Sequence, residues 1–312
     1  MNHKIKFDVI VPCYNVEHIV EKSLDSILSQ KYPKDKFSVI VIDDGSTDNT
    51  LKYLNRFNTE QNFTLISLES NKGLSAARNH GIRNGNSEII CFIDSDMVVQ
   101  PDWLLKMEKI FLIREIIGVI GDIALPKEES PNRLDDYFYS KLRGARQFGK
   151  ESIIGPTWFL FNNSAVKRSA IEKTALFDEK ITYYGGEDTD LAIRIWDLFP
   201  NSFYYSSQIV AEHYHKRTVE QFCSQMEIYG KHNLPILLKR YPEHKKELGG
   251  DWINSIKGLL LFNAFLASLI KYINYFIPHI ILTKYLVIYS AIRGYRNTLL
   301  IFLLLNEDYI FY

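Results

Sequence analysis

The chain has 312 residues, of which 46% are hydrophobic and 24% charged, enough apolar material for one large domain or for a domain with a smaller appendage. Lys plus Arg and Asp plus Glu both number 37, so no global basic field favours nucleic acid as a partner. The three cysteines show neither a disulfide framework nor zinc-site spacing, which favours a reducing compartment. The N-terminus lacks the apolar core and cleavage site of a signal peptide, so we expect a cytoplasmic location.

The first hundred residues alternate strand patterns with helix patterns. The stretch "FDVIVPCYN" predicts a buried strand that breaks at Pro12, and "HIVEKSLDSILSQ" carries apolar side chains at helical spacing. The same alternation recurs in "FSVIVIDDGSTDNT", "FTLISLES", "GLSAARNHGIRNG" and "SEIICFIDSDM". Continuous apolar strands alternating with helices predict an α/β fold with a mostly parallel central sheet and helices on both faces.

Acidic pairs follow two of these strands, Asp43 with Asp44 and Asp94 with Asp96. Ligands of such sheets bind outside the carboxyl ends of the strands, where both pairs fall. Hard oxygen donors suit Mg²⁺ or Mn²⁺, and an ion would relieve the repulsion between Asp94 and Asp96. The alternative is a turn in which the acids cap the next helix.

The middle of the chain adds three informative segments. "GPTWFLFNNSAVKRSAIEK" predicts a strand and a helix, and "YYGGEDTDLAIRIWDLF" predicts a helix preceded by glycines. In that helix Asp190 and Arg194 are expected to form an exposed i,i+4 pair. "SQIVAEHYHKR" predicts a strand that leads to His213 and His215.

The composition changes at Gly258, where apolar blocks alternate with basic residues (Lys271, Lys284, Arg293 and Arg296). No block reaches the roughly 20 apolar residues of a spanning helix. We expect residues 1–240 to form the main domain and residues 241–312 a helical, apolar region that lies on a membrane surface. The alternatives are helices that pack on the rest of the protein or on a second subunit, and hairpin-like helices that dip into the bilayer.

Five motifs in order resemble family 2 glycosyltransferases of the GT-A fold: "VIVPCYN", "VIDDGSTDNT", "NKGLSAARNHGI", "FIDSDM" and "GGEDTDLAIRI". The resemblance covers about the first 215 residues. It implies metal-dependent, inverting transfer of a sugar from a nucleotide-diphosphate sugar, with UDP favoured, to a hydroxyl of a glycan or lipid-linked acceptor in cell-surface polysaccharide or glycoconjugate synthesis. The segment "TALFDE" departs from the "GxFDE" that this family often has, so the resemblance does not define the turn there.

The resemblance also implies site residues. The donor-binding set is Pro12, Tyr14, Asn15, Asp43, Asp44, Asn71, Gly73, Arg78, Asp94 and Ser95. Asp96, Asp94 and a late histidine would hold Mn²⁺ or Mg²⁺; His213 matches better, with His215 open as the alternative. Lys216 and Arg217, the next two residues after His215, would then lie near the diphosphate.

Catalysis needs a base that takes the proton of the acceptor hydroxyl. By resemblance this is Asp188, with Glu187 in a supporting, acceptor-binding role. The position of Asp188 in the first turn of a helix favours an anion there, although acids at this position also serve as ordinary caps. Trp158 and Asn163 are expected on the acceptor side, with a core position as the alternative for Trp158.

Two other functions stay open at this point. A nucleotidyltransferase would use the same acid pair and metal, but it has no use for "GGED". A non-catalytic scaffold of a polysaccharide complex would not need the acids. For the favoured function the expected partners are the donor, the acceptor and the cytoplasmic face of a membrane, with no nucleic acid and with a homo-oligomer open.

Overall fold

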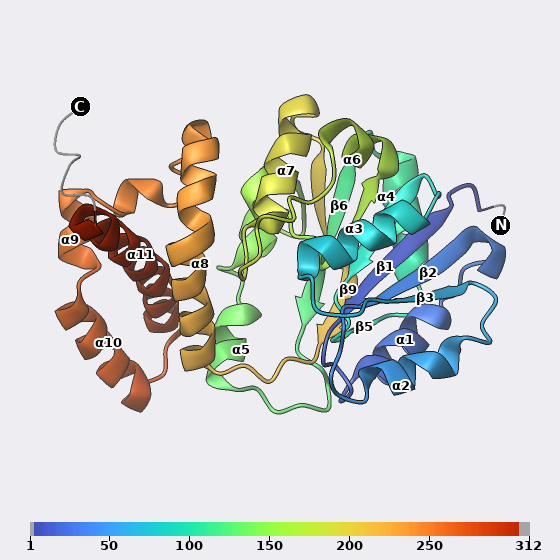
Figure 1. Cartoon of the computed structure of the whole chain (residues 1–312), viewed down its shortest axis with the longest axis horizontal. Helices are drawn as coiled ribbons and strands as arrows, with labels where there is room; N and C mark the ends of the chain where they lie inside the picture. Colours follow the sequence, from blue (N-terminus) through green and yellow to red (C-terminus); the bar gives the residue numbers. More distant parts are fainter. Residues whose placement is uncertain (1–2, 306–312) are drawn as a thin grey trace. The chain divides into compact units, whose positions relative to one another are not determined.

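The computed structural model describes residues 3–305, and side chains are described up to residue 298. Two compact units divide the chain (Figure 1). The sheet unit takes in the chain up to Glu129, Lys141–Thr182 and Glu187–His215, and the helical unit takes in Ser130–Ser140, Tyr183–Gly186 and the chain from Lys216 onward. The domain division at residue 240 stays a prediction.

The sheet unit contains a nine-stranded mixed sheet of order β3-β2-β1-β4-β8-β6-β9-β5, with β7 paired to β9. Its strands are β1 (Phe7–Cys13), β2 (Phe37–Asp43), β3 (Phe63–Ser67), β4 (Ile89–Ile93), β5 (Met97–Val99), β6 (Gly118–Ala124), β7 (Glu151–Ile153), β8 (Asn163–Lys167) and β9 (Phe203–His213). The first four strands in this order are parallel, and β8 is antiparallel to its neighbours β4 and β6. The predicted α/β fold is confirmed.

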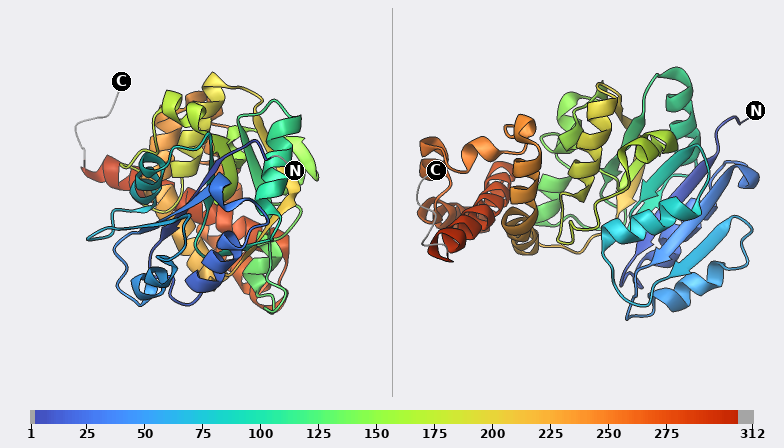
Figure 2. Two further views of the ribbon diagram at one scale, coloured as in Figure 1. Left: turned by 90° about the vertical axis from the view of Figure 1, so that its right-hand side faces the viewer. Right: turned by 45° about the horizontal axis from the view of Figure 1, so that its top comes forward.

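Helices cover both faces of this sheet (Figure 2). On one face α1 (Val20–Leu28), α2 (Thr50–Leu54) and α4 (Trp103–Ile113) pack on alternate residues of β1 such as Val9 and Val11. On the other face α3 (Leu74–Asn84), α6 (Arg168–Thr174) and α7 (Glu187–Leu198) pack on Ile10 and its neighbours. Because successive residues of a strand point to opposite faces, a continuous apolar strand is the pattern of a sheet buried on both sides.

Pro12 does not break the first strand, contrary to the sequence-based expectation. It lies inside β1, opposite Ile42 of β2. The amide of Asp44 donates to the carbonyl of Cys13 (2.8 Å), so the backbone polar groups of Pro12 face away from β2. Pairing of β1 with β4 has ended at Ile10, so the missing N–H of Pro12 costs no ladder hydrogen bond.

Asp190 and Arg194 form the expected pair, but it is not an exposed one. Asp190 is fully buried and accepts from Nη2 of Arg194 at 2.8 Å. The guanidinium also donates to the carbonyls of Ala175 (3.2 Å) and Leu176 (2.9 Å). The pair therefore secures the turn after α6 and is part of the interior.

That turn is strained. Ala175, in the segment where the family pattern has glycine, has φ 64° and ψ 172°, a conformation that only glycine adopts readily. Contacts of Arg194 with the surrounding carbonyls hold the residue in place.

Asn163 is a structural residue, which corrects its expected place on the acceptor side. Its side chain is fully buried: Oδ1 accepts from the indole of Trp103 (2.8 Å), and Nδ2 donates to the carbonyls of Asp122 (2.8 Å) and Ile209 (3.1 Å). All three partners are themselves buried or half-buried polar groups, so Asn163 joins α4, β6 and β9 at the centre of the sheet.

The helical unit consists of α5 (Arg133–Phe138), α8 (Val219–Arg240), α9 (Ile256–Leu261), α10 (Ala264–Phe276) and α11 (Ile280–Leu305). A capping box of Thr218 and Gln221 starts α8. The helices α8 and α11 approach closely at Gly230, where a Cβ atom would lie 1.9 Å from the carbonyl oxygen of Ala291. Within the described residues, no helix is both long and apolar enough to cross a bilayer.

We predict that Ala175→Gly stabilises the protein by about 1 kcal/mol, because glycine adopts this backbone conformation without strain. Ala175 is exposed, so the change removes no core packing. Chemical denaturation measures the difference. Ala175→Val is the matched control and should lower the free energy of unfolding; a Gly variant less stable than wild type would contradict the assignment of strain.

Candidate active site

The candidate site lies at the carboxyl ends of the parallel strands. The chain leaves β1 toward β2 on one side, while β4 pairs on the other side of β1, so the strand order reverses there. Such a reversal opens a crevice in which ligands of open α/β sheets bind. Asp43 and Asp44 follow β2, and Asp94 and Asp96 follow β4, as expected from the sequence.

Side chains tie together the loops after the first three strands. Oδ1 of Asn15 accepts from the amide of Thr47 at 2.8 Å. The carboxylate of Asp44 accepts from the amides of Lys72 (2.8 Å) and Gly73 (2.9 Å), and burial raises its pKa. These contacts bring the predicted donor-binding residues Asn15, Asp44 and Gly73 to one edge of the sheet.

The remaining predicted nucleotide-side residues differ in exposure. Tyr14 is 46% exposed and Asn71 is exposed, whereas Pro12 and Asp43 are buried. Asp43 accepts from the hydroxyl of Ser67 at 3.2 Å, which holds β2 to β3. Exposed Tyr14 and Asn71 therefore present accessible side chains at this edge, while Asp43 supports the loops from inside.

Arg78 of α3 is the centre of the second part of the site. Its side chain is only 2% exposed, and Nη1 donates to Oδ1 of Asp188 at 2.7 Å. Nη2 lies 3.3 Å from Oδ1 of Asp94, and Nη1 lies 3.6 Å from Oε1 of Glu187. One buried guanidinium thus joins Asp94 to two adjacent acids, Glu187 and Asp188, that lie more than 90 residues further along the chain. We call Arg78 and these three acids the Arg78 cluster.

Two phenylalanines complete the Arg78 cluster, and sequence reasoning missed both. The carbonyl of Phe161 accepts from Nη2 of Arg78 (2.7 Å), and its amide donates to Oδ2 of Asp188 (3.1 Å). Cζ of Arg78 lies 5.2 Å from the centroid of the Phe177 ring, within cation–π distance. A buried Phe carries no sequence signal for a backbone role, so the pattern "FLF" could only predict core.

Burial and neighbouring negative charges raise the pKa values of two acids of the cluster. Burial, opposed by Arg78 and reinforced by Asp96 and Asp188, raises the pKa of Asp94 to about 6. Burial and the neighbouring Asp188 raise the pKa of Glu187 to about 7. Three acids around one cation cannot all be fully compensated, so a proton or a further cation is favoured at this place.

Asp96 and His213 form a second contact next to the cluster. Oδ2 of Asp96 lies 3.3 Å from Nε2 of His213, because β5 and β9 pair with Met97 opposite His213. The His215 ring lies 4.9 Å from that of His213, so the second predicted histidine is a neighbour of the first.

A divalent ion fits the Asp96 and His213 pair by donor chemistry. Ligands about 2.1 Å from an ion and roughly at right angles are about 3 Å apart, close to the observed separation. Within the described part of the chain, no group of three or more His, Cys, Asp or Glu side chains is arranged as a metal cage. The pair would leave the other positions of an ion open, which is the pattern of Mg²⁺ and Mn²⁺ sites that share a substrate phosphate.

Two more predicted residues are placed by the structure. Ser95, between the two acids, is buried and faces the thiol of Cys13. Trp158 is half-buried, and its ring packs edge-on to Phe148 at 5.8 Å. Neither belongs to the Arg78 cluster, and the acceptor-side role of Trp158 stays a prediction.

Comparison with known proteins identifies the family. The model of glycosyl transferase family 2 matches residues 8–169, which is 162 of the 312 residues. The chain belongs to glycosyl transferase family 2. This confirms the family and the enzyme class expected from the five motifs, and neither the nucleotidyltransferase nor the scaffold alternative gains support.

Curated relatives of this family 2 glycosyltransferase match over part of their length. The uncharacterized glycosyltransferase YfnE of Bacillus subtilis is 30% identical over 237 residues, covering 61% of this chain and 60% of YfnE. The glycosyltransferase GlyA of Streptococcus pneumoniae is 35% identical over 145 residues, covering 46% of this chain and 20% of GlyA. The chain therefore spans less than two thirds of the length of each of these two relatives.

Solved structures show the same fold. Residues 1–349 of TarS from Staphylococcus aureus superpose with a TM-score of 0.57 at 19% identity, covering 98% of this chain and 93% of that one. The mannosyltransferase PcManGT of Pyrobaculum calidifontis, solved with GDP-Man and Mn²⁺, gives a TM-score of 0.61 at 21% identity, covering 94% and 88%. These likenesses extend over the helical part as well as the sheet.

We predict that Glu187→Gln gains stability relative to wild type as the pH rises. Because the pKa of Glu187 is raised from 4.5 to about 7, the folded state keeps a proton that the unfolded chain releases. Stability from this proton is present below pH 4.5 and is lost as the pH rises through 7. Glutamine cannot ionise, so the variant should be more stable than wild type at pH 8 by about 1–3 kcal/mol, with little difference near pH 5.

Denaturant titrations at the two pH values test this, with the exposed Glu69→Gln as a control for loss of one carboxylate. A stability difference between Glu187→Gln and wild type that is the same at both pH values would show that Glu187 is not the buried acid described here.

Proposed function

We propose that the protein transfers a sugar, with inversion, from a nucleotide-diphosphate sugar to a hydroxyl group of a glycan or lipid-linked acceptor, and that it needs Mn²⁺ or Mg²⁺ to do so. The observation that carries the proposal is the Arg78 cluster lying beside the Asp96 and His213 contact at the carboxyl ends of the strands. Together these groups offer a cation, a place for a metal and a carboxylate at one point of the sheet.

Asp96 and His213 are the residues that would hold the metal, with Asp94 beside them. When bound, the ion neutralises charge on the departing diphosphate. Asp94 is held by Arg78, so its carboxylate is kept in position next to Asp96. The raised pKa of Asp94, about 6, is a sign that this place favours additional positive charge.

Asp188 is proposed as the general base. Arg78 and the amide of Phe161 each bind one of its oxygens, which fixes the direction of the carboxylate. The remaining lone pairs can accept the proton of the acceptor hydroxyl as its oxygen attacks the anomeric carbon. Oε2 of Glu187 is buried and, within the described residues, has no hydrogen-bond partner, which suits a role in binding the acceptor.

UDP is the proposed nucleotide. TarS has been solved with UDP and with UDP-GlcNAc, whereas PcManGT has been solved with GDP-Man, so the fold accommodates either base. Tyr14 and Asp44 would meet the base, with the amides of Lys72 and Gly73 holding the Asp44 carboxylate. The name of TarS, a poly(ribitol-phosphate) β-N-acetylglucosaminyltransferase, supports a cell-surface polymer as one class of acceptor.

Attachment to the cytoplasmic face of a membrane is part of the proposal. Its support is the row of exposed apolar side chains on α9 and α10, which includes Leu260, Phe265 and Phe276. Such side chains need a partner, and a membrane surface would also bring a lipid-linked acceptor to the enzyme.

The direct test is slow hydrolysis of donors without an acceptor. We expect one nucleotide sugar of a panel to be cleaved with Mn²⁺ or Mg²⁺ and not with EDTA, and Asp96→Ala to abolish the cleavage because the metal loses a ligand. With the acceptor known, Asp188→Asn should lower kcat by about 10²- to 10⁴-fold with little change in KM.

Asp197→Asn, an exposed change on the same helix, is the matched control for Asp188→Asn and should behave as wild type. Donor cleavage that is equally fast in EDTA would contradict the metal site. Full activity of Asp188→Asn would remove Asp188 as the base.

A further inference from the structure

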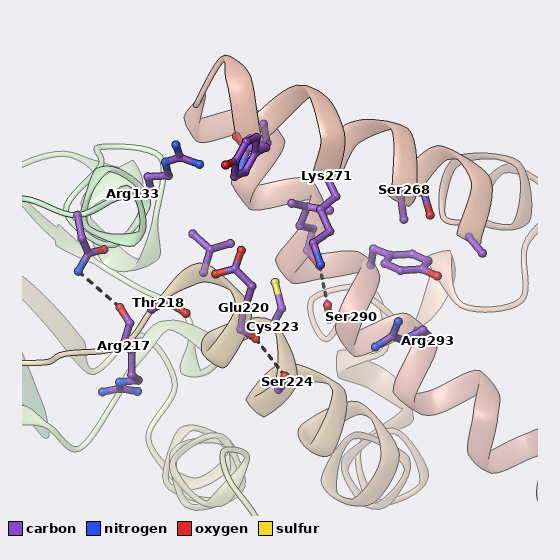
Figure 3. Close-up of a pocket in the computed structure, with 18 of the residues that line it drawn as sticks. Arg133, Arg217, Thr218, Glu220, Cys223, Ser224, Ser268, Lys271, Ser290 and Arg293 are labelled. Carbon is purple, nitrogen blue, oxygen red and sulfur yellow. Dashed lines mark hydrogen bonds between the residues drawn. The ribbon is translucent and has the colours of Figure 1, made fainter.

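The helical unit contains a pocket of about 830 Å³ between α5, α8, α10 and α11 (Figure 3). This volume is in the range of pockets for small ligands. All residues that line it belong to the helical unit, whereas the Arg78 cluster belongs to the sheet unit. None of the five family motifs contains a residue that lines this pocket.

Positive charge dominates the pocket. Five basic side chains line it, against a single carboxylate, Glu220; they are Arg133, Lys216, Arg217, Lys271 and Arg293. They come from four separate segments of the chain, so the folding of the unit is what gathers them. A chain with zero formal net charge has concentrated cations here, which favours an anionic ligand.

Other protein groups neutralise only part of this charge. Arg293 is paired with Glu227 of α8, and the Arg133 guanidinium lies 5.4 Å from the ring of Tyr275. Lys216 and Lys271 are exposed and have no ion pair with the described residues. Figure 3 shows Lys271 pointing toward Ser290 and Cys223 in the interior of the pocket.

The helices beside Lys271 carry exposed apolar side chains. Phe265 is 81% exposed and Leu260 is 70% exposed, and the exposed Tyr272 and Phe276 follow Lys271 on α10. So many large apolar side chains exposed on two successive helices are uncommon on a protein that functions alone in water. A basic side chain among aromatic side chains on a short apolar helix is typical of helices that lie in a membrane interface.

We propose that the pocket binds the phosphate group of an anionic membrane lipid, while the exposed apolar side chains of α9 and α10 enter the surface of the bilayer. The lipid phosphate matches the excess of Lys and Arg, and the acyl region matches the apolar helices. This inference deepens the membrane attachment of the proposed function, because it names the lipid group that is bound and the residues that bind it.

The test measures binding of the full chain to sedimenting vesicles. Wild type should bind vesicles of phosphatidylcholine with phosphatidylglycerol and should bind pure phosphatidylcholine only weakly. Lys271→Gln should weaken binding to the anionic vesicles by about fivefold, the effect of one cation near such a surface. Lys52→Gln is the matched control: Lys52 is an exposed lysine of α2 in the sheet unit, outside the pocket and outside the helices that enter the bilayer surface, and should change binding by no more than about twofold.

Three outcomes would overturn the proposal. Equal losses in Lys271→Gln and Lys52→Gln would mean general charge attraction and no pocket. Binding of inorganic pyrophosphate without binding of anionic vesicles would mean a site for a free anion. A dimer in sedimentation experiments that fails to bind vesicles would mean that a second copy of the chain covers the apolar helices.

Donor hydrolysis by the same variants separates this proposal from the proposed function. Lys271 lies outside the sheet unit, so Lys271→Gln should hydrolyse the donor as wild type does. Loss of vesicle binding with normal hydrolysis would support the lipid site, whereas normal vesicle binding without any hydrolysis would count against the proposed transfer alone.

Discussion

The buried guanidinium of Arg78 is the interaction on which the rest of the site depends. It contacts Asp94, Glu187 and Asp188, three half-buried or buried acids that would repel one another at this place without a cation. One helix, one strand end and the start of another helix are thereby fixed around a single group. The charge is not fully balanced, as the raised pKa values of Asp94 and Glu187 indicate. The site is therefore stable enough to fold and still favours a further cation.

The fold of the first hundred residues could be predicted because its signals are local. Continuous apolar strands, helical spacing and acids at strand ends all belong to short stretches, and the structure has β1, β2, β4 and α3 where these patterns lie. The pairing of Asp96 with His213 was also foreseen as a shared site, although it needs a contact across more than a hundred residues. In that case the resemblance to related GT-A enzymes, which use a late histidine as a metal ligand, supplied the long-range information.

What could not be predicted depends on contacts between distant segments. Asn163 was expected near the acceptor, but its amide satisfies three buried groups that no local pattern links to it. Asp190 was expected at the surface because i,i+4 pairs usually are, whereas Arg194 is needed by the strained turn at Ala175. The long helix α8 went unnoticed, although its capping box at Thr218 was a readable signal.

The central claim is that the acids at the strand ends form a metal-dependent site for a nucleotide diphosphate. Calorimetric titration of the wild-type protein with UDP, and with GDP for comparison, tests it most directly. We expect UDP or GDP to bind in the presence of Mn²⁺, and the affinity to fall by about tenfold or more in EDTA. Equal affinity with and without the metal, or no binding of either nucleotide, would contradict it.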